Sequence, residues 1–302
     1  MLFIFRSLVK VDSQNPKLSY RFWGNCPKIY EYLVETFYCK IITQKVLSMN
    51  LLKVYYKIDK PKNGRRFAVG DIHGCAKTFR KLVIEELELT KTDQLFLLGD
   101  YIDKGPDSKG VLDFIMELLA EGFQIFPIRG NHEQMLLESV ENDNPRVFEK
   151  ILRLNKIRNL ADENGEVYPK YLVFLRSLKY YVILDDFYLV HAGVDFSKEN
   201  IFADLHKILW VRPTEFDAEL ANRKLNGKKV IHGHTPISIE AIQHQIENRE
   251  QFICLDNGCC DVFRKRRSFA EREIGMLCAL DLDSFELFEV GNTDSVRRIR
   301  KL

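Results

Sequence analysis

Six polar residues of the kinds that bind metal ions stand at the ends of apolar segments of the sequence. They are Asp71, His73, Asp100, Asn131, His191 and His234. The spacing is regular, because Asp100 follows Asp71 by 29 residues and Asn131 follows Asp100 by 31. Oxygen and nitrogen ligands without thiolate suit Mn, Fe or Zn, whereas a structural zinc site is usually rich in Cys. These residue types at this spacing predict a centre for two metal ions.

The elements that must position these residues alternate along the chain. Short apolar runs predict strands at 66–71, 93–100 and 123–130, and apolar residues at helical spacing predict helices at 78–89, 109–122 and 131–141. Asp107 is expected to open the second helix and Gly122 to end it. This order predicts an α/β protein with βαβ crossovers and a mostly parallel sheet. Because ligands bind at the carboxyl ends of parallel strands, the polar turns should meet in one crevice.

The second half of the chain is rich in short apolar runs. Strands are expected on both sides of the Asp185-Asp186 turn and in the runs KKVIHGHT, QFICLD, MLCALDLD and ELFEV. These strands suggest a second sheet that packs against the first. Residues 141–175 are charged and helical in pattern, so we expect a helical insert there.

Each motif also has an interpretation without chemistry. An Asp that follows Gly at the end of a strand often only caps a turn, and a single His there is often a half-buried structural residue. The same kind of side chain recurs at every βαβ step, and this recurrence favours the metal site.

The motifs GDIHG, GDYIDKG, GNHE, HAG and HGHT resemble those of the phosphoprotein-phosphatase branch of the calcineurin-like metallophosphoesterases, and most closely its bacterial and phage members. The resemblance covers about residues 65–290. It implies a two-sheet β-sandwich of mixed strands flanked by helices, the metallophosphoesterase fold. It also implies two divalent metal ions between the sheets, with Mn expected before Fe or Zn.

The resemblance assigns a role to each metal-binding residue. Asp71 and His73 would hold the first ion, and Asp100 would bridge both ions. The second ion would take one amide and two imidazole ligands, which are Asn131, His191 and His234. A bridging carboxylate suits this chemistry, because its two oxygens can serve two cations that share and activate one water.

Four further residues match the family's catalytic and phosphate-binding motifs. His132, paired with Asp103, resembles the general acid that protonates the leaving group. Lys104 stands where the family normally has Arg, so a flexible point charge replaces a planar fork at the phosphate. Arg212, in LWVR, resembles the family's Trp-x-Arg stretch and would be a second phosphate ligand, although a surface arginine would look the same.

Several neighbouring residues are expected to be structural. His232 should pack near the site rather than bind metal, and Cys75 should be a small packed residue. The nuclease-type relatives have a second His where this chain has Pro236, so the motif favours the phosphatase branch. Asp256, in CLDNGCC, is assigned no metal.

Composition bounds the domain organisation and the compartment. Residues 1–48 carry seven Lys or Arg and three Asp or Glu, whereas the rest of the chain carries 38 and 40. We expect 1–48 to be an N-terminal extension, with a native start at Met49 as one hypothesis, and 49–302 to be the catalytic domain. Seven cysteines without a C-x-x-C pair suit a reducing cytoplasm, and neither a membrane span nor specific nucleic-acid binding is expected.

The sequence therefore predicts a phosphatase that uses metal-bound hydroxide directly, without a covalent intermediate. A protein serine/threonine phosphatase is the first hypothesis, and a symmetrical diadenosine tetraphosphate hydrolase is the alternative. The partner is then either a phosphorylated protein or a small phosphate ester or dinucleotide. A nuclease and a non-catalytic metal-binding scaffold are disfavoured, the latter because ligands and acid pair are both present.

Overall fold

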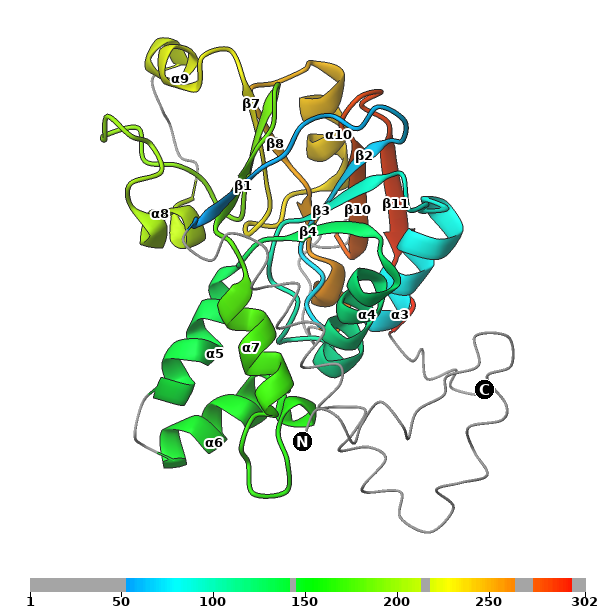
Figure 1. The fold of residues 1–302 in the computed structure, drawn as a ribbon, viewed down its shortest axis with the longest axis vertical. Helices are drawn as coiled ribbons and strands as arrows, with labels where there is room; N and C mark the ends of the chain where they lie inside the picture. The colour runs from blue at the N-terminus through cyan, green and yellow to red at the C-terminus, as the bar shows by residue number, and fades with distance from the viewer. Residues whose placement is uncertain (1–52, 142–144, 213–217, 264–273, 295–302) are drawn as a thin grey trace, which may run out of the picture. The chain divides into compact units, whose positions relative to one another are not determined.

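The computed structural model describes residues 53–141, 145–212, 218–263 and 274–294. The N-terminal extension expected at 1–48 lies outside the described residues. Within the described part, two sheets carry most of the strands and helices surround them (Figure 1).

The first sheet combines parallel and antiparallel strands. Its order is β11 (Leu287–Gly291), β10 (Met276–Asp281), β2 (Arg66–Val69), β3 (Gln94–Leu97) and β4 (Gln124–Pro127), and β9 (Asp256–Asn257) also pairs with β10. β2, β3 and β4 run parallel to one another, as their predicted βαβ connections require. β10 runs antiparallel to β2 and to β11.

The second sheet is also mixed. Its order is β1 (Tyr55–Lys57), β5 (Tyr181–Ile183), β6 (Phe187–Val190), β7 (Lys229–His232) and β8 (Phe252–Cys254). β5 and β6 form the antiparallel pair predicted around the Asp185-Asp186 turn. β6, β7 and β8 run parallel, so their carboxyl ends lie at one edge.

One expectation about the sheets is wrong, and one strand was not predicted. The strands predicted from MLCALDLD and ELFEV do not join the second sheet, because β10 and β11 extend the first sheet beyond β2. Strand β1, which the sequence did not predict, pairs in parallel with β5. Which strands pair depends on contacts between segments that are distant in the sequence. Such contacts produce no local sequence pattern.

The helices predicted at 78–89, 109–122 and 131–141 lie close to observed helices, whereas the helices after residue 200 were not predicted. The helices of the described residues are α3 (Ala76–Lys81), the π-helix η2 (Leu82–Glu86), α4 (Ser108–Glu121), α5 (Asn131–Glu141), α6 (Pro145–Leu154), the 3₁₀ helix η3 (Arg158–Leu160), α7 (Pro169–Ser177), α8 (Leu205–Trp210), α9 (Ala218–Leu225), α10 (Ile239–Glu247) and the 3₁₀ helix η4 (Cys259–Phe263). The Asp107 side chain caps α4 by accepting a hydrogen bond from the backbone N of Gly110 (2.8 Å). Gly122 ends α4 with φ = 92°, as expected of a C-terminal glycine.

The helices α5, α6 and α7 lie together at one end of the sheets (Figure 1). All three follow β4 and precede β5; α6 and most of α7 occupy the region 141–175 expected to hold the insert, and α5 precedes it. α7 is joined to α4, because the Tyr171 hydroxyl donates to Asp113 Oδ1 (2.9 Å) and Lys170 Nζ lies 3.2 Å from the same oxygen. Among the described helices, none has the length and apolar character needed to cross a bilayer.

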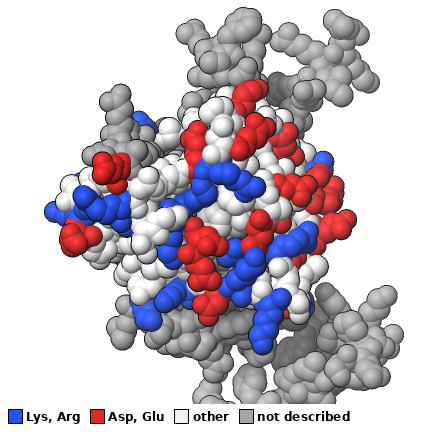
Figure 2. Space-filling model, turned by 90° about the horizontal axis from the view of Figure 1, so that it is seen from above, with Lys and Arg blue, Asp and Glu red and all other residues white. Residues whose placement is uncertain are grey.

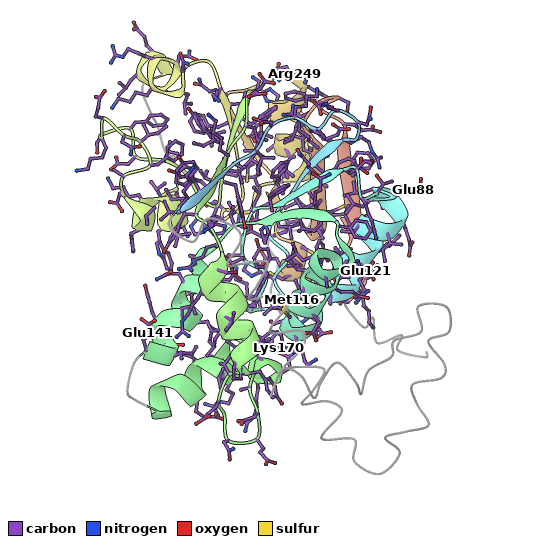
Figure 3. All side chains as sticks on the ribbon, viewed as in Figure 1. Glu88, Met116, Glu121, Glu141, Lys170 and Arg249 are labelled. Atoms are coloured by element: carbon purple, nitrogen blue, oxygen red, sulfur yellow. The ribbon has the colours of Figure 1, made fainter. Side chains whose placement is uncertain are left out.

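The core lies between the two sheets, where side chains fill the layer (Figure 3). Ala68 and Phe96 from the first sheet and Leu189, Ile231 and Ile253 from the second belong to one buried cluster. Burial of this apolar surface holds the sheets against each other. The carboxyl ends of β2, β3, β4, β6 and β7 carry the polar turns of the predicted site.

One buried hydroxyl connects the ends of β3 and β4. Tyr101 Oη lies 2.6 Å from the carbonyl of Ile128 and 3.0 Å from that of Leu97, and the side chain is fully buried. The hydroxyl therefore fixes the turn that follows β3 against the segment that follows β4.

Tyr101→Phe tests this connection. Loss of the buried hydroxyl leaves two carbonyls with one donor fewer, so we expect the free energy of unfolding to fall by about 1–2 kcal/mol. Urea denaturation measures the change. Tyr55→Phe is the matched control, because Tyr55 stacks on Tyr181 and its hydroxyl makes no hydrogen bond within the described residues. An equal loss in both variants would contradict this role.

Candidate metal centre

The backbone of the predicted site is in a conformation that residues with side chains seldom adopt. Positive φ angles occur at His73 (46°), Asp100 (51°), Asp103 (73°), Lys104 (63°) and His234 (72°). Left-handed backbone costs free energy at a residue other than Gly, and such residues gather where the surrounding structure fixes a functional geometry. All five belong to the residues that the sequence singled out for chemistry.

Four predicted ligand atoms converge between β4, β6 and β7. Asn131 Oδ1 lies 2.8 Å from His191 Nε2 and 3.0 Å from His234 Nδ1, and the two imidazole nitrogens are 3.2 Å apart. Asp100 Oδ1 lies 3.5 Å from His191 Nε2. The His191 Nδ1–H donates to the carbonyl of Leu98 (2.9 Å), which leaves Nε2 unprotonated and facing the cluster.

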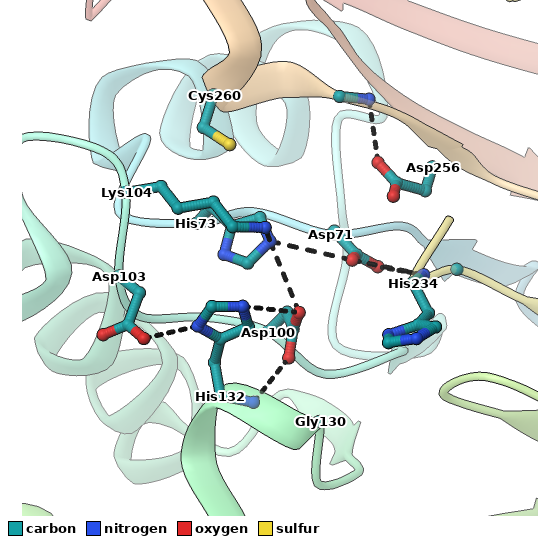
Figure 4. A network of polar contacts seen from close by, with 12 residues as sticks. Asp71, His73, Asp100, Asp103, Lys104, Gly130, His132, His234, Asp256 and Cys260 are labelled. Atoms are coloured by element: carbon teal, nitrogen blue, oxygen red, sulfur yellow. Dashed lines mark hydrogen bonds and ion pairs between the residues drawn. The ribbon is translucent and has the colours of Figure 1, made fainter. Parts of the chain in front are cut away.

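A second group surrounds the other oxygen of Asp100 (Figure 4). His73 Nε2 lies 3.3 Å from Asp100 Oδ2 and 3.8 Å from Asp71 Oδ2, and His73 Nδ1–H donates to a backbone carbonyl. His132 Nε2 lies 3.8 Å from Asp100 Oδ2. Lys104 Nζ lies 2.7 Å from His73 Nε2. Asp100 thus has one oxygen toward each group.

Burial prepares three of the histidines to act as ligands. It lowers the pKa of His73 well below its usual range, lowers that of His191, and with the charge of His191 lowers that of His234 to about 4. A neutral imidazole offers a lone pair to a metal ion, whereas an imidazolium does not. These three rings are therefore neutral at neutral pH and able to bind a cation.

Negative charge is concentrated at the same place. Burial and the charges of Asp256 and Asp100 raise the pKa of Asp71 well above its usual range. Burial raises the pKa of Asp256 to about 7. Burial alone would lower the pKa of Lys104. Cys260 and the carboxylates of Asp100, Asp71 and Asp256 raise it overall. Buried carboxylates held this close together fit divalent cations, which would relieve their mutual repulsion.

Asp256 is a residue of the site that the sequence analysis left without a role. It is buried, its Oδ1 accepts a hydrogen bond from Gly258 N (2.8 Å), and its charge raises the pKa of Asp71. It follows β8 in the same way that the predicted ligands follow their strands, which is the signal that could have identified it. His232, expected to be structural, ends β7 in a buried position, where burial lowers its pKa to about 4.

His132 differs from the other histidines. Its Nδ1 makes a short hydrogen bond to Asp103 Oδ2. Burial would lower the pKa of His132, but the charges of Asp100 and Asp103 raise it overall. His132 therefore tends to keep its proton while its three neighbours lose theirs, and its Nε2 faces the cluster.

The polar turns of β3 and β4 are held together by Glu133, the fourth residue of GNHE. Its fully buried carboxylate accepts hydrogen bonds from the backbone N of Asp100 (2.9 Å), Tyr101 (2.8 Å) and Gly130 (2.9 Å), with a longer contact from Ile102. Burial and the charge of Asp100 raise the pKa of Glu133 to about 7. The sequence analysis missed this role, because the bonds to Asp100, Tyr101 and Ile102 join residues about 30 positions apart.

Two glycines allow the carboxylates to approach the backbone. A Cβ at Gly130 would lie 2.2 Å from Asp100 Oδ1, and a Cβ at Gly233 would lie 2.1 Å from Asp71 Oδ1. The absence of a side chain lets His132 N donate to Asp100 Oδ1 (3.0 Å) and His234 N donate to Asp71 Oδ1 (3.1 Å). The Gly-Asn and Gly-His steps of the motifs are therefore steric requirements.

The cluster opens into a cavity of about 630 Å³. Its lining includes Asp100, Lys104, Asn131, His132, Trp210, Arg212 and His234. Lys104 and Arg212, which the sequence predicted to bind phosphate, therefore both line the cavity that contains the candidate ligands. The Trp210 ring meets that of His234 edge to face, with centroids 6.4 Å apart.

Comparison with known proteins decides the family. A family model described as calcineurin-like phosphoesterase matches residues 65–264. The chain belongs to this family. The family and the fold class expected from the sequence are thereby confirmed, and the matched residues include every predicted ligand of the calcineurin-like site.

Two relatives with different names are similar to this calcineurin-like chain. The symmetrical bis(5'-nucleosyl)-tetraphosphatase of Nitrosospira multiformis is 33% identical over 129 residues, which are 42% of this chain and 43% of the relative. Serine/threonine-protein phosphatase 1 of Salmonella typhimurium is 42% identical over 88 residues, which are 29% of this chain and 38% of the relative. The chain thus matches about two fifths of the length of these relatives.

A solved structure supports the fold. The protein serine/threonine phosphatase from Saccharomyces cerevisiae aligns with a TM-score of 0.57, covering 87% of this chain and 91% of that chain. At 14% identity, this likeness shows the fold alone.

Glu133→Gln tests how the metal centre is held. The new amide would direct N–H donors at backbone N–H groups, so we expect the free energy of unfolding to fall by about 2–4 kcal/mol and Mn²⁺ affinity to weaken. Urea denaturation and calorimetric titration measure the two effects. Glu138→Gln is the control, because Glu138 lies on the same helix, is exposed and bonds only Gln134 in its helix. Unchanged stability and affinity in Glu133→Gln would refute the role.

Proposed function

We propose that the chain is a protein phosphatase that hydrolyses phosphoserine and phosphothreonine. The observation that carries the proposal is the hydrogen bond between His132 Nδ1 and Asp103 Oδ2, which lies beside the ligand cluster. Asp103 accepts a hydrogen bond from His132 Nδ1 and so keeps a proton on that nitrogen. The other ring nitrogen, Nε2, then faces the substrate cavity.

The chemistry of the leaving group favours this substrate. Hydrolysis of a serine or threonine phosphate expels an alkoxide, which is a strong base and needs a proton as the P–O bond breaks. Symmetrical cleavage of a dinucleoside tetraphosphate expels a nucleoside diphosphate, whose oxygen is already a stable anion. A proton from His132 Nε2 to the departing oxygen therefore helps the first reaction far more than the second.

We propose that the two divalent ions are Mn²⁺. Asp71, His73 and Asp100 would hold one ion, while Asp100, Asn131, His191 and His234 would hold the other. When bound, the ions would supply an activated water and neutralise charge on the phosphate. The neutral imidazoles and crowded carboxylates of the centre support this assignment.

The remaining charged residues of the cavity would orient the phosphate. Lys104 comes from the same turn as Asp103, and Arg212 lies at the exposed side of the cavity. Lysine presents a single charge, whereas arginine can present two parallel donors. We propose that Lys104 neutralises phosphate charge and that Arg212 contributes to its orientation.

A symmetrical diadenosine tetraphosphate hydrolase is the second candidate. The similarity to the Nitrosospira multiformis relative favours it. A phosphopeptide and a dinucleoside tetraphosphate both carry fewer negative charges than a nucleic acid. Figure 2 shows Lys and Arg side chains interspersed with Asp and Glu side chains on the face in view, and such a mixed face does not favour a polyanion.

We also propose a cytoplasmic location and a catalytic domain within 49–302. The five cysteines of the described part, Cys75, Cys254, Cys259, Cys260 and Cys278, are all buried and free of disulfides. Free buried thiols are usual in a reducing compartment and support this assignment.

His132→Asn tests the proposed acid. We expect kcat for a phosphoserine peptide to fall by about 10²- to 10⁴-fold, because the leaving alkoxide loses its proton donor. Metal content should stay unchanged, since His132 is not a proposed ligand. Steady-state kinetics and elemental analysis give the two readouts.

Parallel assays on the Mn²⁺-loaded protein test the substrate. A phosphoserine peptide, a generic aryl phosphate and diadenosine tetraphosphate would be compared at equal enzyme concentration. The proposal expects the highest kcat/KM on the phosphopeptide. A strong preference for the dinucleotide, with His132→Asn nearly as active as the wild type on it, would overturn the first candidate in favour of the second.

A further inference from the structure

The turn that follows α6 contacts the turn that carries Asp103. The backbone N of Lys104 donates to the carbonyl of Asn155 (3.1 Å), and Lys156 Nζ donates to the carbonyl of Lys104 (2.8 Å). Lys156 has φ = 60°, so this turn also adopts left-handed backbone. The region expected only to be an inserted helical segment therefore reaches the candidate site.

One side chain of this turn contacts the proposed acid pair itself. Asn155 Nδ2 donates to Asp103 Oδ2 at 3.0 Å, and this oxygen also holds His132 Nδ1. Asp103 Oδ1 is buried and has no hydrogen-bond partner within the described ranges of the chain. All side-chain contacts that set the rotation of the Asp103 carboxylate are thus made at a single oxygen.

Within the described residues, two side-chain donors hold the Asp103 carboxylate, His132 Nδ1 and Asn155 Nδ2, and both bind Oδ2. Burial raises the pKa of Asp103, and its hydrogen bond to His132 opposes that rise. The Asn155 amide adds a neutral donor that stabilises the carboxylate without competing as a cation. It therefore keeps Asp103 in the position that orients the His132 ring.

We infer that Asn155 is a positioning residue for general acid catalysis by His132. The inference rests on the proposed function, because it assigns Asn155 a task only if His132 gives a proton to the leaving oxygen. Asn155 would act through Asp103 and would touch neither the substrate nor the ligands. In the step, a water oxygen forms a new bond to phosphorus and gives up a proton to solvent, while the P–O bond to the leaving group breaks. The electron pair of that bond stays on the leaving oxygen, which takes the proton from His132 Nε2, and the phosphoryl group is released as phosphate.

A purely structural role would look different. The two backbone-directed bonds, from Lys104 N and from Lys156 Nζ, already join this turn to the Asp103 turn, and neither depends on the Asn155 side chain. Removal of the Asn155 amide should therefore leave the join in place. What it removes is the second donor to Asp103 Oδ2.

The test compares two substrates that differ in their need for an acid. Phenyl phosphate expels a phenolate about as basic as that of tyrosine, whereas 2,4-dinitrophenyl phosphate expels a weakly basic anion that leaves without a proton. We expect Asn155→Ala to lower kcat for phenyl phosphate by about tenfold or more and kcat for the dinitrophenyl ester by less than about twofold. Asn155→Leu, which keeps the branched shape without the donor, should behave in the same way.

Asn159→Ala is the matched control. Asn159 lies four residues after Asn155, and its side-chain amide donates to Asp107 Oδ1 at 3.1 Å. The variant therefore loses a similar hydrogen bond, but one that does not involve the acid pair. We expect Asn159→Ala to change kcat for both substrates by the same factor. Equal losses on the two substrates in both Asn155 variants, or the same selectivity in Asn159→Ala, would overturn the inference.

His132→Asn, assayed with the same pair of esters, separates this inference from the proposed function. If His132→Asn lowers kcat for phenyl phosphate more than kcat for the dinitrophenyl ester and the Asn155 variants do not, the inference alone is wrong. If His132→Asn shows no selectivity, the proposed acid is wrong and the role of Asn155 fails with it.

Discussion

The buried charge of Asp100 is the constraint around which the centre is arranged. Burial would raise the pKa of this carboxyl group, but the imidazoles of His191, His132 and His73, with Lys104, lower it overall. The carboxylate therefore stays ionised in a place where an ionised group is costly. Its two oxygens face two separate groups of donors, and that division is the geometric basis for two cations.

The surrounding structure serves to hold this charge in place. Glu133 binds the backbone on both sides of Asp100 to the turn after β4, and Gly130 leaves room for the carboxylate beside the start of α5. The strained φ angles at Asp100 and its neighbours are maintained by these contacts. Removing one contact should disturb several ligands together, because the same turns carry them.

Much of this arrangement could be predicted from local sequence. The Gly-Asp and Gly-Asn steps after β2, β3 and β4 indicated the positions of three proposed ligands, because parallel strands bring their carboxyl ends together. Asp107 and Gly122 marked the ends of α4 through capping chemistry that depends only on nearby residues. The family resemblance supplied the roles proposed for these residues.

The rest depends on contacts between distant segments. The place of β10 in the first sheet follows from its pairing with β2, about 210 residues earlier along the chain, and β11 joins the sheet by pairing with β10. Asn155 stands in a charged helical stretch with no motif, and its contact with Asp103 exists only in the folded chain. Asp256 was assigned no metal, although it follows its strand in the same way as the proposed ligands.

The central claim is that Asp100 holds two cations at once. Calorimetric titration with Mn²⁺, supported by elemental analysis, tests it on the wild type and on Asp100→Asn. We expect two ions bound to each wild-type chain and a clear loss of stoichiometry or affinity at both positions in the variant, because one bridging carboxylate would serve both. A variant that binds two ions as tightly as the wild type would contradict it.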